Sequence, residues 1–218
     1  MPKLRSVLFD LDGTLVDVVG ATTRCVEAIV QASGARRVER NEIRRAIGET
    51  RNARGRLALW IAEAIRAHDG RPPNTRLIMR ALGDVGRYIE PDLRAVRMFT
   101  RVAATHRVAI VTNGPRALQR AKLRAAGLSD LVPAPRVVIS GELGVRKPDP
   151  RIFRAALRVT EMPADATLFV GDDEREDVEG ARAAGLRTCR VAPVGAVTSA
   201  DATVPHVSDI EEVLACET

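Results

Sequence analysis

The chain has 218 residues, which suits one large domain or one domain that carries an insertion. Hydrophobic residues make up 45% of it, too many for a disordered chain, but aromatic residues only 3%, so the core must be aliphatic. The net charge is +6, spread along the chain, and only Lys3, Lys122 and Lys147 are lysines among the 34 basic residues. Because no aromatic residues alternate with the basic ones, we expect no nucleic-acid partner. Attraction of small anionic substrates is a better explanation of the positive charge.

The sequence contains no sign of export or of membrane insertion. No apolar run approaches the ~18 residues of a membrane span, and the N-terminal stretch MPKLRSVLFD has too short an apolar run for a signal peptide. The cysteines Cys25, Cys189 and Cys216 are far apart, so we expect neither a disulfide nor a thiolate metal site. We therefore expect a cytoplasmic protein, with a monomer and a homodimer both left open.

The first 92 residues predict one strand followed by helices. Residues 5–9 are apolar and predict a buried strand. Apolar residues then recur at helical spacing, and glycines end several of the segments, as they often end helices. The predicted helical segments are 20–34, 38–48, 54–70 and 71–90.

From residue 92 onward, strands and helices alternate. The predicted order is helix 92–106, strand 107–114, helix 115–127, strand 136–140, helix 149–160, strand 166–173, helix 175–185, strand 186–193 and helix 208–217. Short apolar strands that alternate with helices predict a parallel sheet covered on both faces. We therefore expect an α/β protein whose Rossmann-like core, residues 1–15 and 93–218, is flanked by helices and interrupted by an all-helical insert, residues 16–92.

Polar residues gather where the predicted strands end, which is the edge at which open parallel sheets bind their ligands. Four segments bring them there: Asp10, Asp12 and Thr14; Thr112, Asn113 and Gly114; Arg146, Lys147 and Pro148; and Gly171, Asp172 and Asp173, with Asp177 one helical turn further. Acids this close would repel one another or bind protons unless a cation balanced them. Mg²⁺ prefers such oxygen ligands and leaves room for water and phosphate. The positive charges of such a cation and of Lys147 would attract a small dianion. The four segments therefore predict a site for a group such as a phosphoryl group.

Four short motifs appear in order along the chain: DLDGT at 10–14, VTNG at 111–114, RKPDP at 146–150 and GDDERED at 171–177. With these motifs, and with a helical insert after the first, the sequence resembles the haloacid dehalogenase (HAD) superfamily of hydrolases. The resemblance covers the whole predicted core and implies that the insert is a helical cap over the active site.

The resemblance also implies roles for individual residues. Asp10 would be the nucleophile that forms an aspartyl-phosphate, and Asp12 the general acid and base. Thr112 would hold a phosphoryl oxygen, helped by the backbone N–H groups of Asn113 and Gly114. Lys147 would neutralise both the nucleophile and the phosphoryl group.

The metal ligands implied by the resemblance come from two motifs. Mg²⁺ would bind Asp10, the backbone carbonyl of Asp12, and Asp172. Many relatives have Ser or Thr at the position of Asp173, so either Asp173 or Asp177 completes the shell, and we rank Asp177 ahead. Arg24, Arg51 or Arg54 of the insert could contact an anionic substrate tail.

The residues separate several branches of the superfamily. Dehalogenases lack the second acid of the first motif, here Asp12, while phosphonate-cleaving enzymes and many mutases use a lysine of the insert, and residues 16–92 contain none. A receiver-like protein would carry its acids in another strand order. The sequence therefore favours a phosphatase for a small phosphorylated metabolite: a nucleotide, sugar or organic-acid phosphate. A phosphosugar mutase, a dehalogenase-type enzyme and a non-catalytic metal-binding module remain as alternatives.

Overall fold

A computed structural model of the chain describes residues 3–35, 38–50 and 54–216. The chain folds into two compact units, which we call the core unit, residues 1–16 and 91–218, and the helical unit, residues 17–90. The chain passes from the core unit into the helical unit after residue 16 and returns after residue 90. The functional reading of these units as a catalytic core and a cap stays a prediction.

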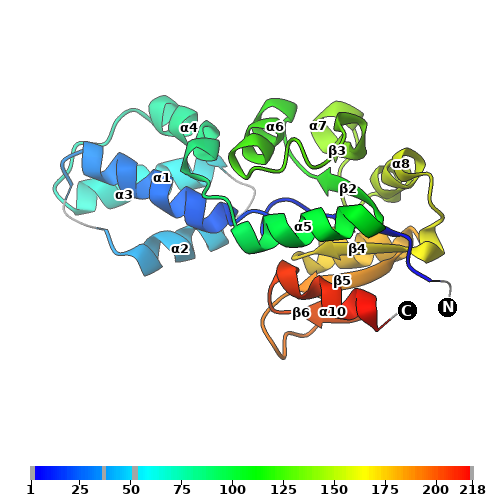
Figure 1. Cartoon of the computed structure of the whole chain (residues 1–218). Coiled ribbons are helices and arrows are strands. Elements are labelled where there is room, and N and C mark those ends of the chain that lie inside the picture. The colour runs from blue at the N-terminus through cyan, green and yellow to red at the C-terminus, as the bar shows by residue number, and fades with distance from the viewer. Residues whose placement is uncertain (1–2, 36–37, 51–53, 217–218) are drawn as a thin grey trace. The chain divides into compact units, whose positions relative to one another are not determined.

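The core unit is built on one sheet of six parallel strands in the order β3-β2-β1-β4-β5-β6 (Figure 1). The strands are β1 (Ser6–Phe9), β2 (Arg107–Thr112), β3 (Val137–Ile139), β4 (Thr167–Gly171), β5 (Arg187–Val191) and β6 (Ala202–Val204). This sheet confirms the predicted Rossmann-like α/β class. Strand β6 is not predicted from the sequence, because three residues among polar loop positions have no recognisable period.

Helices connect these strands and cover the sheet. They are α5 (Leu93–Thr105), α6 (Arg116–Ala125), α7 (Ser140–Leu143), α8 (Pro150–Thr160), α9 (Gly180–Ala183) and α10 (Ile210–Ala215). Short 3₁₀ turns lie at η2 (Ala134–Arg136), η3 (Ala164–Ala166) and η5 (Val207–Asp209), and a π-helix, η4 (Glu174–Glu179), precedes α9. The single helix expected at 175–185 is thus divided into a π-helical and an α-helical part.

The central strands are buried on both faces, which explains why their sequences are almost continuously apolar. Leu8 of β1 lies in register with Phe169 of β4, and both pack in one cluster with Phe153 of α8. The rings of Phe153 and Phe169 meet edge to face, with centroids 5.0 Å apart. On the opposite face, the ring of Phe9 contacts that of Phe99 in α5, at 5.3 Å between centroids.

The helical unit contains α1 (Val18–Ala32), α2 (Arg40–Glu49), α3 (Arg54–Ala67), α4 (Thr75–Gly83) and the 3₁₀ turn η1 (Val85–Tyr88). Side-chain caps begin two of these helices, because Asp17 accepts a hydrogen bond from the N–H of Gly20 and Asn74 accepts one from Leu77. These caps satisfy backbone donors that have no partner within the helix.

Arg24 has a structural partner inside the helical unit. Its guanidinium donates two hydrogen bonds, of 2.9 and 2.7 Å, to the carbonyl of Tyr88, and so ties α1 to η1. The guanidinium of Arg24, which is one of the candidates for contact with an anionic substrate tail, is therefore bound to the backbone of η1. Of the other two candidates, Arg51 lies outside the described residues, as does the side chain of Arg54.

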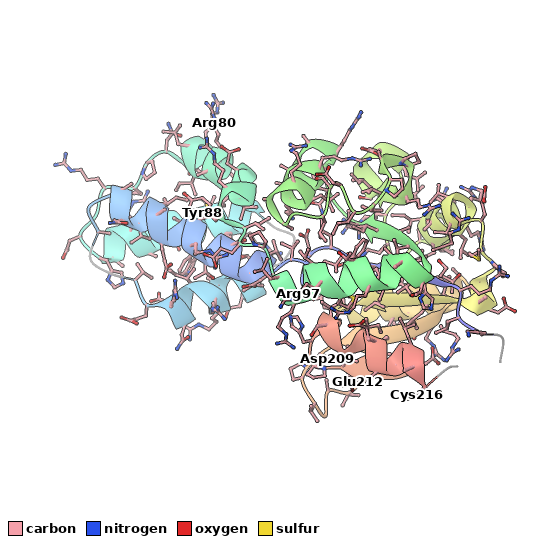
Figure 2. The ribbon with its side chains drawn as sticks, in the orientation of Figure 1. Arg80, Tyr88, Arg97, Asp209, Glu212 and Cys216 are labelled. Atoms are coloured by element: carbon pink, nitrogen blue, oxygen red, sulfur yellow. The ribbon has the colours of Figure 1, made fainter. Side chains whose placement is uncertain are left out.

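None of the three cysteines of the chain takes part in a disulfide in the structure, which describes all three. Cys25 and Cys189 are buried free thiols, and Cys216 is a free thiol at the exposed end of α10 (Figure 2). Among the helices of the described ranges, none combines the length and the apolar character needed to cross a bilayer.

Leu8 is fully buried at the centre of the sheet, so truncating it tests the packing of the core unit. We expect Leu8→Ala to lower the free energy of unfolding by about 2–5 kcal/mol, because the cavity it leaves cannot collapse. Leu93→Ala is the matched control, since Leu93 is 62% exposed, and should change stability by no more than ~0.5 kcal/mol. Urea unfolding followed by circular dichroism measures both, and equal losses would contradict the packing described.

Candidate active site

The sheet has one point at which its connections reverse direction. From β1 the chain adds β2 and β3 on one side, and it later adds β4, β5 and β6 on the other. The loops that leave β1 and β4 therefore diverge at the carboxyl ends of two adjacent strands, and such switch points are where open α/β sheets bind ligands. Asp10 follows β1 directly, and its N–H donates to the carbonyl of Val170 at 2.8 Å, which extends the ladder and fixes its backbone.

Three carboxylates meet at this point. Asp10, Asp172 and Asp177 each present an oxygen within 4.8 Å of those of the other two. Lys147 lies among them: its Nζ donates to Asp10 Oδ1 at 2.5 Å and to Asp177 Oδ1 at 2.6 Å. Asp10, Asp177 and Lys147 are 4%, 1% and 2% exposed, so the charges interact with little screening by water. The structure thus brings together four residues that the sequence analysis selected from three separate motifs.

The charges of this cluster do not balance. Three carboxylates face one buried ammonium, which leaves two negative charges in excess when all are ionised. Burial raises the pKa of Asp10 well above its usual value, and although Lys147 lowers it, repulsion from Asp177, Asp172 and Asp12 raises it further. Burial would lower the pKa of Lys147, but attraction to Asp10 and Asp177 outweighs this and raises it. A divalent cation would remove the excess, and an all-oxygen donor set fits Mg²⁺.

Two glycines make room for the carboxylates. Gly13 has φ +93°, and a Cβ added to it would lie 2.6 Å from the carboxylate carbon of Asp172. A Cβ on Gly171 would lie 2.3 Å from an oxygen of Asp177. Any side chain at either position would displace an acid of the cluster, so these glycines of the first and fourth motifs serve the site by being small.

The structure distinguishes between Asp173 and Asp177. Asp173 begins η4, and its Oδ1 accepts hydrogen bonds from the N–H groups of Arg175 and Glu176 at 3.0 and 2.8 Å. Asp177 instead points back into the cluster, with Oδ2 accepting from the N–H of Asp173 at 3.0 Å and Oδ1 accepting from Lys147. The N–H of Val178 reaches the carbonyl of Asp173, five residues earlier, as in π-helical turns that often mark functional sites.

Asp12 has partners of its own. Lys122 of α6 donates from Nζ to both carboxylate oxygens of Asp12, at 2.7 and 2.6 Å. Gln119, one turn earlier on α6, donates from Nε2 to Asp12 Oδ2 at 3.1 Å and to Thr112 Oγ1 at 2.5 Å. Neither residue belongs to one of the four motifs, so the motifs do not predict these contacts. The signal available in the sequence was the spacing of Gln119 and Lys122, which are three residues apart in the helical segment after the VTNG motif. Lys122 is also one of only three lysines in the chain.

The loop after β2 makes hydrogen bonds to other parts of the core unit, and its expected role in binding phosphate stays a prediction. The side chain of Asn113 holds the backbone of Lys147 from both sides, since Nδ2 donates to its carbonyl at 3.1 Å and Oδ1 accepts from its N–H at 2.9 Å. The N–H of Gly114, expected at a phosphoryl oxygen, donates to Ser140 Oγ at 2.9 Å. Thr112 is fully buried. Its hydroxyl and the carboxylate of Asp12 both accept a hydrogen bond from the side-chain amide of Gln119.

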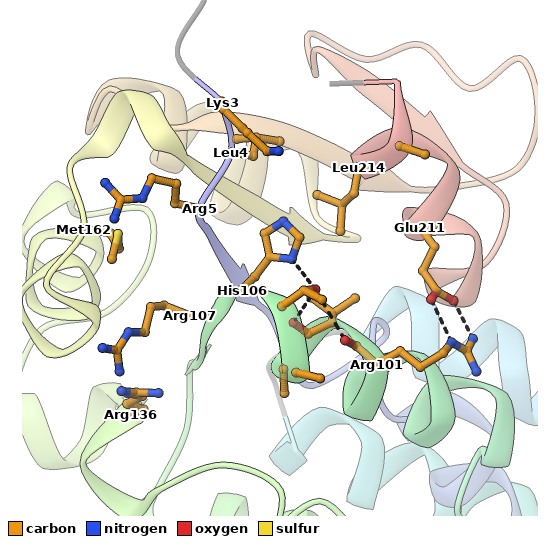
Figure 3. Close-up of a pocket in the computed structure, with 15 residues that line it drawn as sticks. Lys3, Leu4, Arg5, Arg101, His106, Arg107, Arg136, Met162, Glu211 and Leu214 are labelled. Carbon is orange, nitrogen blue, oxygen red and sulfur yellow. Dashed lines mark hydrogen bonds and ion pairs between the residues drawn. The ribbon is translucent and has the colours of Figure 1, made fainter. Parts of the chain in front are cut away.

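A separate cavity of about 1050 Å³ opens at the opposite, amino-terminal edge of the sheet (Figure 3). Its wall includes Lys3, Arg5 and His106, and Arg101 there donates to Glu211 in two hydrogen bonds of 2.7 and 2.5 Å. None of the clustered carboxylates lines it. The acidic cluster at the carboxyl edge is therefore the better candidate for chemistry.

Comparison with known proteins agrees with this geometry. The family model described as haloacid dehalogenase-like hydrolase matches residues 4–185. A Bacillus subtilis HAD-hydrolase, YfnB, has the same fold, with a TM-score of 0.78 and 20% identity over 98% of this chain and 99% of that one. The chain therefore belongs to the haloacid dehalogenase-like hydrolases, which confirms the resemblance seen in the motifs.

Curated relatives of this chain carry phosphatase names. The phosphoserine phosphatase of Thermus thermophilus is 48% identical over 80 residues, which is 37% of this chain and 31% of that protein. The phosphoglycolate phosphatase of Rhodospirillum rubrum is 32% identical over 197 residues, which is 85% of this chain and 78% of that protein. The chain thus spans about a third of the first of these relatives and most of the second.

The glycine at position 13 gives a direct test of the cation site. We expect Gly13→Ala to remove the rise in melting temperature that MgCl₂ produces in the parent protein, because its Cβ displaces Asp172. Gly127→Ala is the matched control: Gly127 also has a positive φ, +72°, but its Cβ would meet nothing within 4 Å. Melting curves with MgCl₂ and with EDTA measure the effect, and equal responses of the two variants would contradict the cation site.

Proposed function

We propose that this hydrolase is a Mg²⁺-dependent phosphomonoesterase that forms an aspartyl-phosphate on Asp10. The observation that carries the proposal is the cluster of Asp10, Asp172 and Asp177 at the switch point of the sheet, in which Asp10 and Asp177 are buried and paired with Lys147. A phosphate monoester brings more negative charge to carboxylates that already exceed their cations, so its binding needs both Lys147 and a divalent cation. Support for the reaction class comes from the phosphatase names of the relatives.

In the first step, an oxygen of Asp10 attacks phosphorus and the bond from phosphorus to the ester oxygen breaks. The hydrogen bond from Lys147 to Oδ1 holds the carboxylate of Asp10 in one orientation and offsets part of the charge of the phosphoryl group. Because Gln119 donates to Thr112 Oγ1, the proton of the Thr112 hydroxyl is left to donate to a phosphoryl oxygen. The departing alkoxide takes its proton from Asp12.

In the second step, a water molecule attacks the same phosphorus and gives its proton to Asp12, while the bond to Asp10 breaks and inorganic phosphate leaves. Asp12 takes up a proton before the first step, when one of its oxygens exchanges a present donor for that proton, and it recovers the proton in the second step, while Asp10 is regenerated as a carboxylate. Asp10, Asp172 and Asp177, with the backbone carbonyl of Asp12, are the groups that would hold Mg²⁺. The cation, when bound, supplies positive charge that shields the attacking carboxylate from the phosphoryl oxygens.

The other groups of the site act on position and access. Asn113 fixes the backbone of Lys147 through its side chain. We assign the Gly114 N–H to a phosphoryl oxygen only after it exchanges its present partner, Ser140. The helical unit, as a cap, would exclude water during the first step.

Asp12 and the helical unit weigh against the alternatives. Displacement of a halide needs no proton donor, yet Asp12 is present and has Lys122 and Gln119 as dedicated partners, which favours an oxygen leaving group. The helical unit has no lysine to steer a phosphorylated intermediate as a mutase would. A non-catalytic metal-binding module would not need a buried threonine and a second acid beside the cluster.

We further propose a small phosphorylated metabolite as substrate, no nucleic-acid partner, and a cytoplasmic location for a monomer or homodimer. Three free thiols, two of them buried, support a reducing compartment. Burial raises the pKa of the Cys189 thiol to about 12 and, with the charge of Asp84, that of Cys25 to about 11, so neither is a reactive thiolate at neutral pH.

Replacing the nucleophile tests the reaction. With MgCl₂ and a panel of phosphorylated metabolites, we expect phosphate release by the parent protein, and a loss of at least about 10³-fold in Asp10→Asn, whose amide cannot form the intermediate. Asp130→Asn, at an exposed position far along the chain, is the control and should keep full activity. EDTA should abolish release reversibly. An active Asp10→Asn variant would overturn the nucleophile assignment.

A parallel screen distinguishes the reaction classes. We expect no halide release from short 2-haloacids and no isomerisation of sugar phosphates under conditions in which phosphate is released. Ion chromatography detects halide, and NMR detects isomerised sugar phosphates. Halide release that exceeds phosphate release would replace the phosphatase proposal with a dehalogenase.

A further inference from the structure

Lys122 and Gln119 form a buried polar pair on α6 that no motif of the sequence analysis included. Lys122 is 4% exposed and Gln119 fully buried. Lysine is almost never fully buried unless its charge is paired, and the partner of Lys122 here is the carboxylate of Asp12. We propose, on the basis of the phosphatase function above, that Lys122 and Gln119 are positioning residues that hold Asp12 in the orientation required for proton transfer.

Three hydrogen bonds limit the rotation of the Asp12 carboxylate. Lys122 Nζ reaches both of its oxygens, at 2.7 and 2.6 Å, and Gln119 Nε2 reaches Oδ2 at 3.1 Å. Three donor contacts from one rigid helix leave the side chain little freedom to rotate. A general acid and base must lie within hydrogen-bond reach of its proton partner, so fixing the rotamer of Asp12 raises the fraction of productive encounters.

Gln119 also links the two halves of the site. Its Nε2 donates to Asp12 and, at 2.5 Å, to Thr112 Oγ1. An ionised carboxylate can only accept hydrogen bonds, so its contact sets the amide orientation, with nitrogen toward Asp12 and Thr112. The remaining amide oxygen, Oε1, is buried without a hydrogen-bond partner among the described residues. One amide therefore sets the distance between the proton-transfer group and the hydroxyl that holds phosphate.

Both acids of the first motif are paired with a lysine and not with an arginine. The chain uses arginine at nearly every basic position, yet two of its three lysines, Lys122 and Lys147, are buried, each against one acid of the first motif. An ammonium is a compact point charge on a flexible stem, whereas a guanidinium is a broad planar fork. Each acid thus has a cation small enough to leave room for a phosphoryl group beside it.

The leaving group distinguishes positioning of Asp12 from a general structural role. Esters of 4-nitrophenol need little protonation as they leave, whereas phenyl phosphate and glycerol 2-phosphate depend on it increasingly. We expect Lys122→Met to lower kcat/KM by less than ~3-fold for 4-nitrophenyl phosphate and by ~10- to 100-fold for glycerol 2-phosphate, within the range that acid–base catalysis contributes. Lys3→Met, which removes the exposed lysine, is the control and should leave the whole series unchanged.

A double-mutant cycle closes the test. In an Asp12→Asn background, Lys122→Met should cost less than ~3-fold for every ester, because the group it positions is gone. Should Lys122→Met not fold, Gln119→Met carries the same comparison, with circular dichroism and melting temperature as controls of folding. An equal loss across the esters, or the same loss with and without Asp12, would overturn the positioning role. Those results leave the nucleophile untouched, which Asp10→Asn tests separately.

Discussion

The buried ion pairs of Lys147 are the constraint on which the rest of the site depends. Its ammonium lies between Asp10 and Asp177, and all three groups are almost fully removed from water. Without the lysine, three adjacent carboxylates would repel one another or take up protons, and a protonated Asp10 could not act as the proposed nucleophile. Even with it, the negative charge exceeds the positive, which is the condition under which a hard divalent cation binds.

Much of the core unit can be understood as support for that lysine. Asn113 grips its backbone from both sides, and Phe169, whose ring belongs to the buried cluster under the sheet, lies 5.5 Å from its Nζ. The π-helical turn of η4 directs Asp177 back toward it, while Asp173 caps the same turn. Contacts therefore run without a break from the packing of β4 against α8 to the charged cluster. A change in the packing of the core unit should for this reason also change the geometry of the site.

The site contains two acid–lysine pairs with different surroundings. Asp10 and Lys147 are sealed within the cluster, whereas the side chain of Asp12, paired with Lys122, is 26% exposed. This difference fits the roles proposed for the two acids, because a nucleophile must stay fixed and poorly solvated, whereas a proton-transfer group must exchange protons with a leaving group and with water. Gln119 of α6 contacts both Asp12 and Thr112, so it links the second pair to the residue that ends β2.

The sequence by itself determined the class of fold, the family and the four segments that build the site. Alternating apolar strands and helices specify a parallel sheet because each strand must be buried on both faces, and polar residues directly after such strands must meet at one edge. Only the tertiary structure decided that Asp177 rather than Asp173 joins the acids, that Gly114 donates to Ser140, and that Lys122 and Gln119 contact Asp12. The reason is physical: strand order and strand ends follow from local patterns, but the direction of a side chain depends on the twist of a turn and on partners distant in sequence.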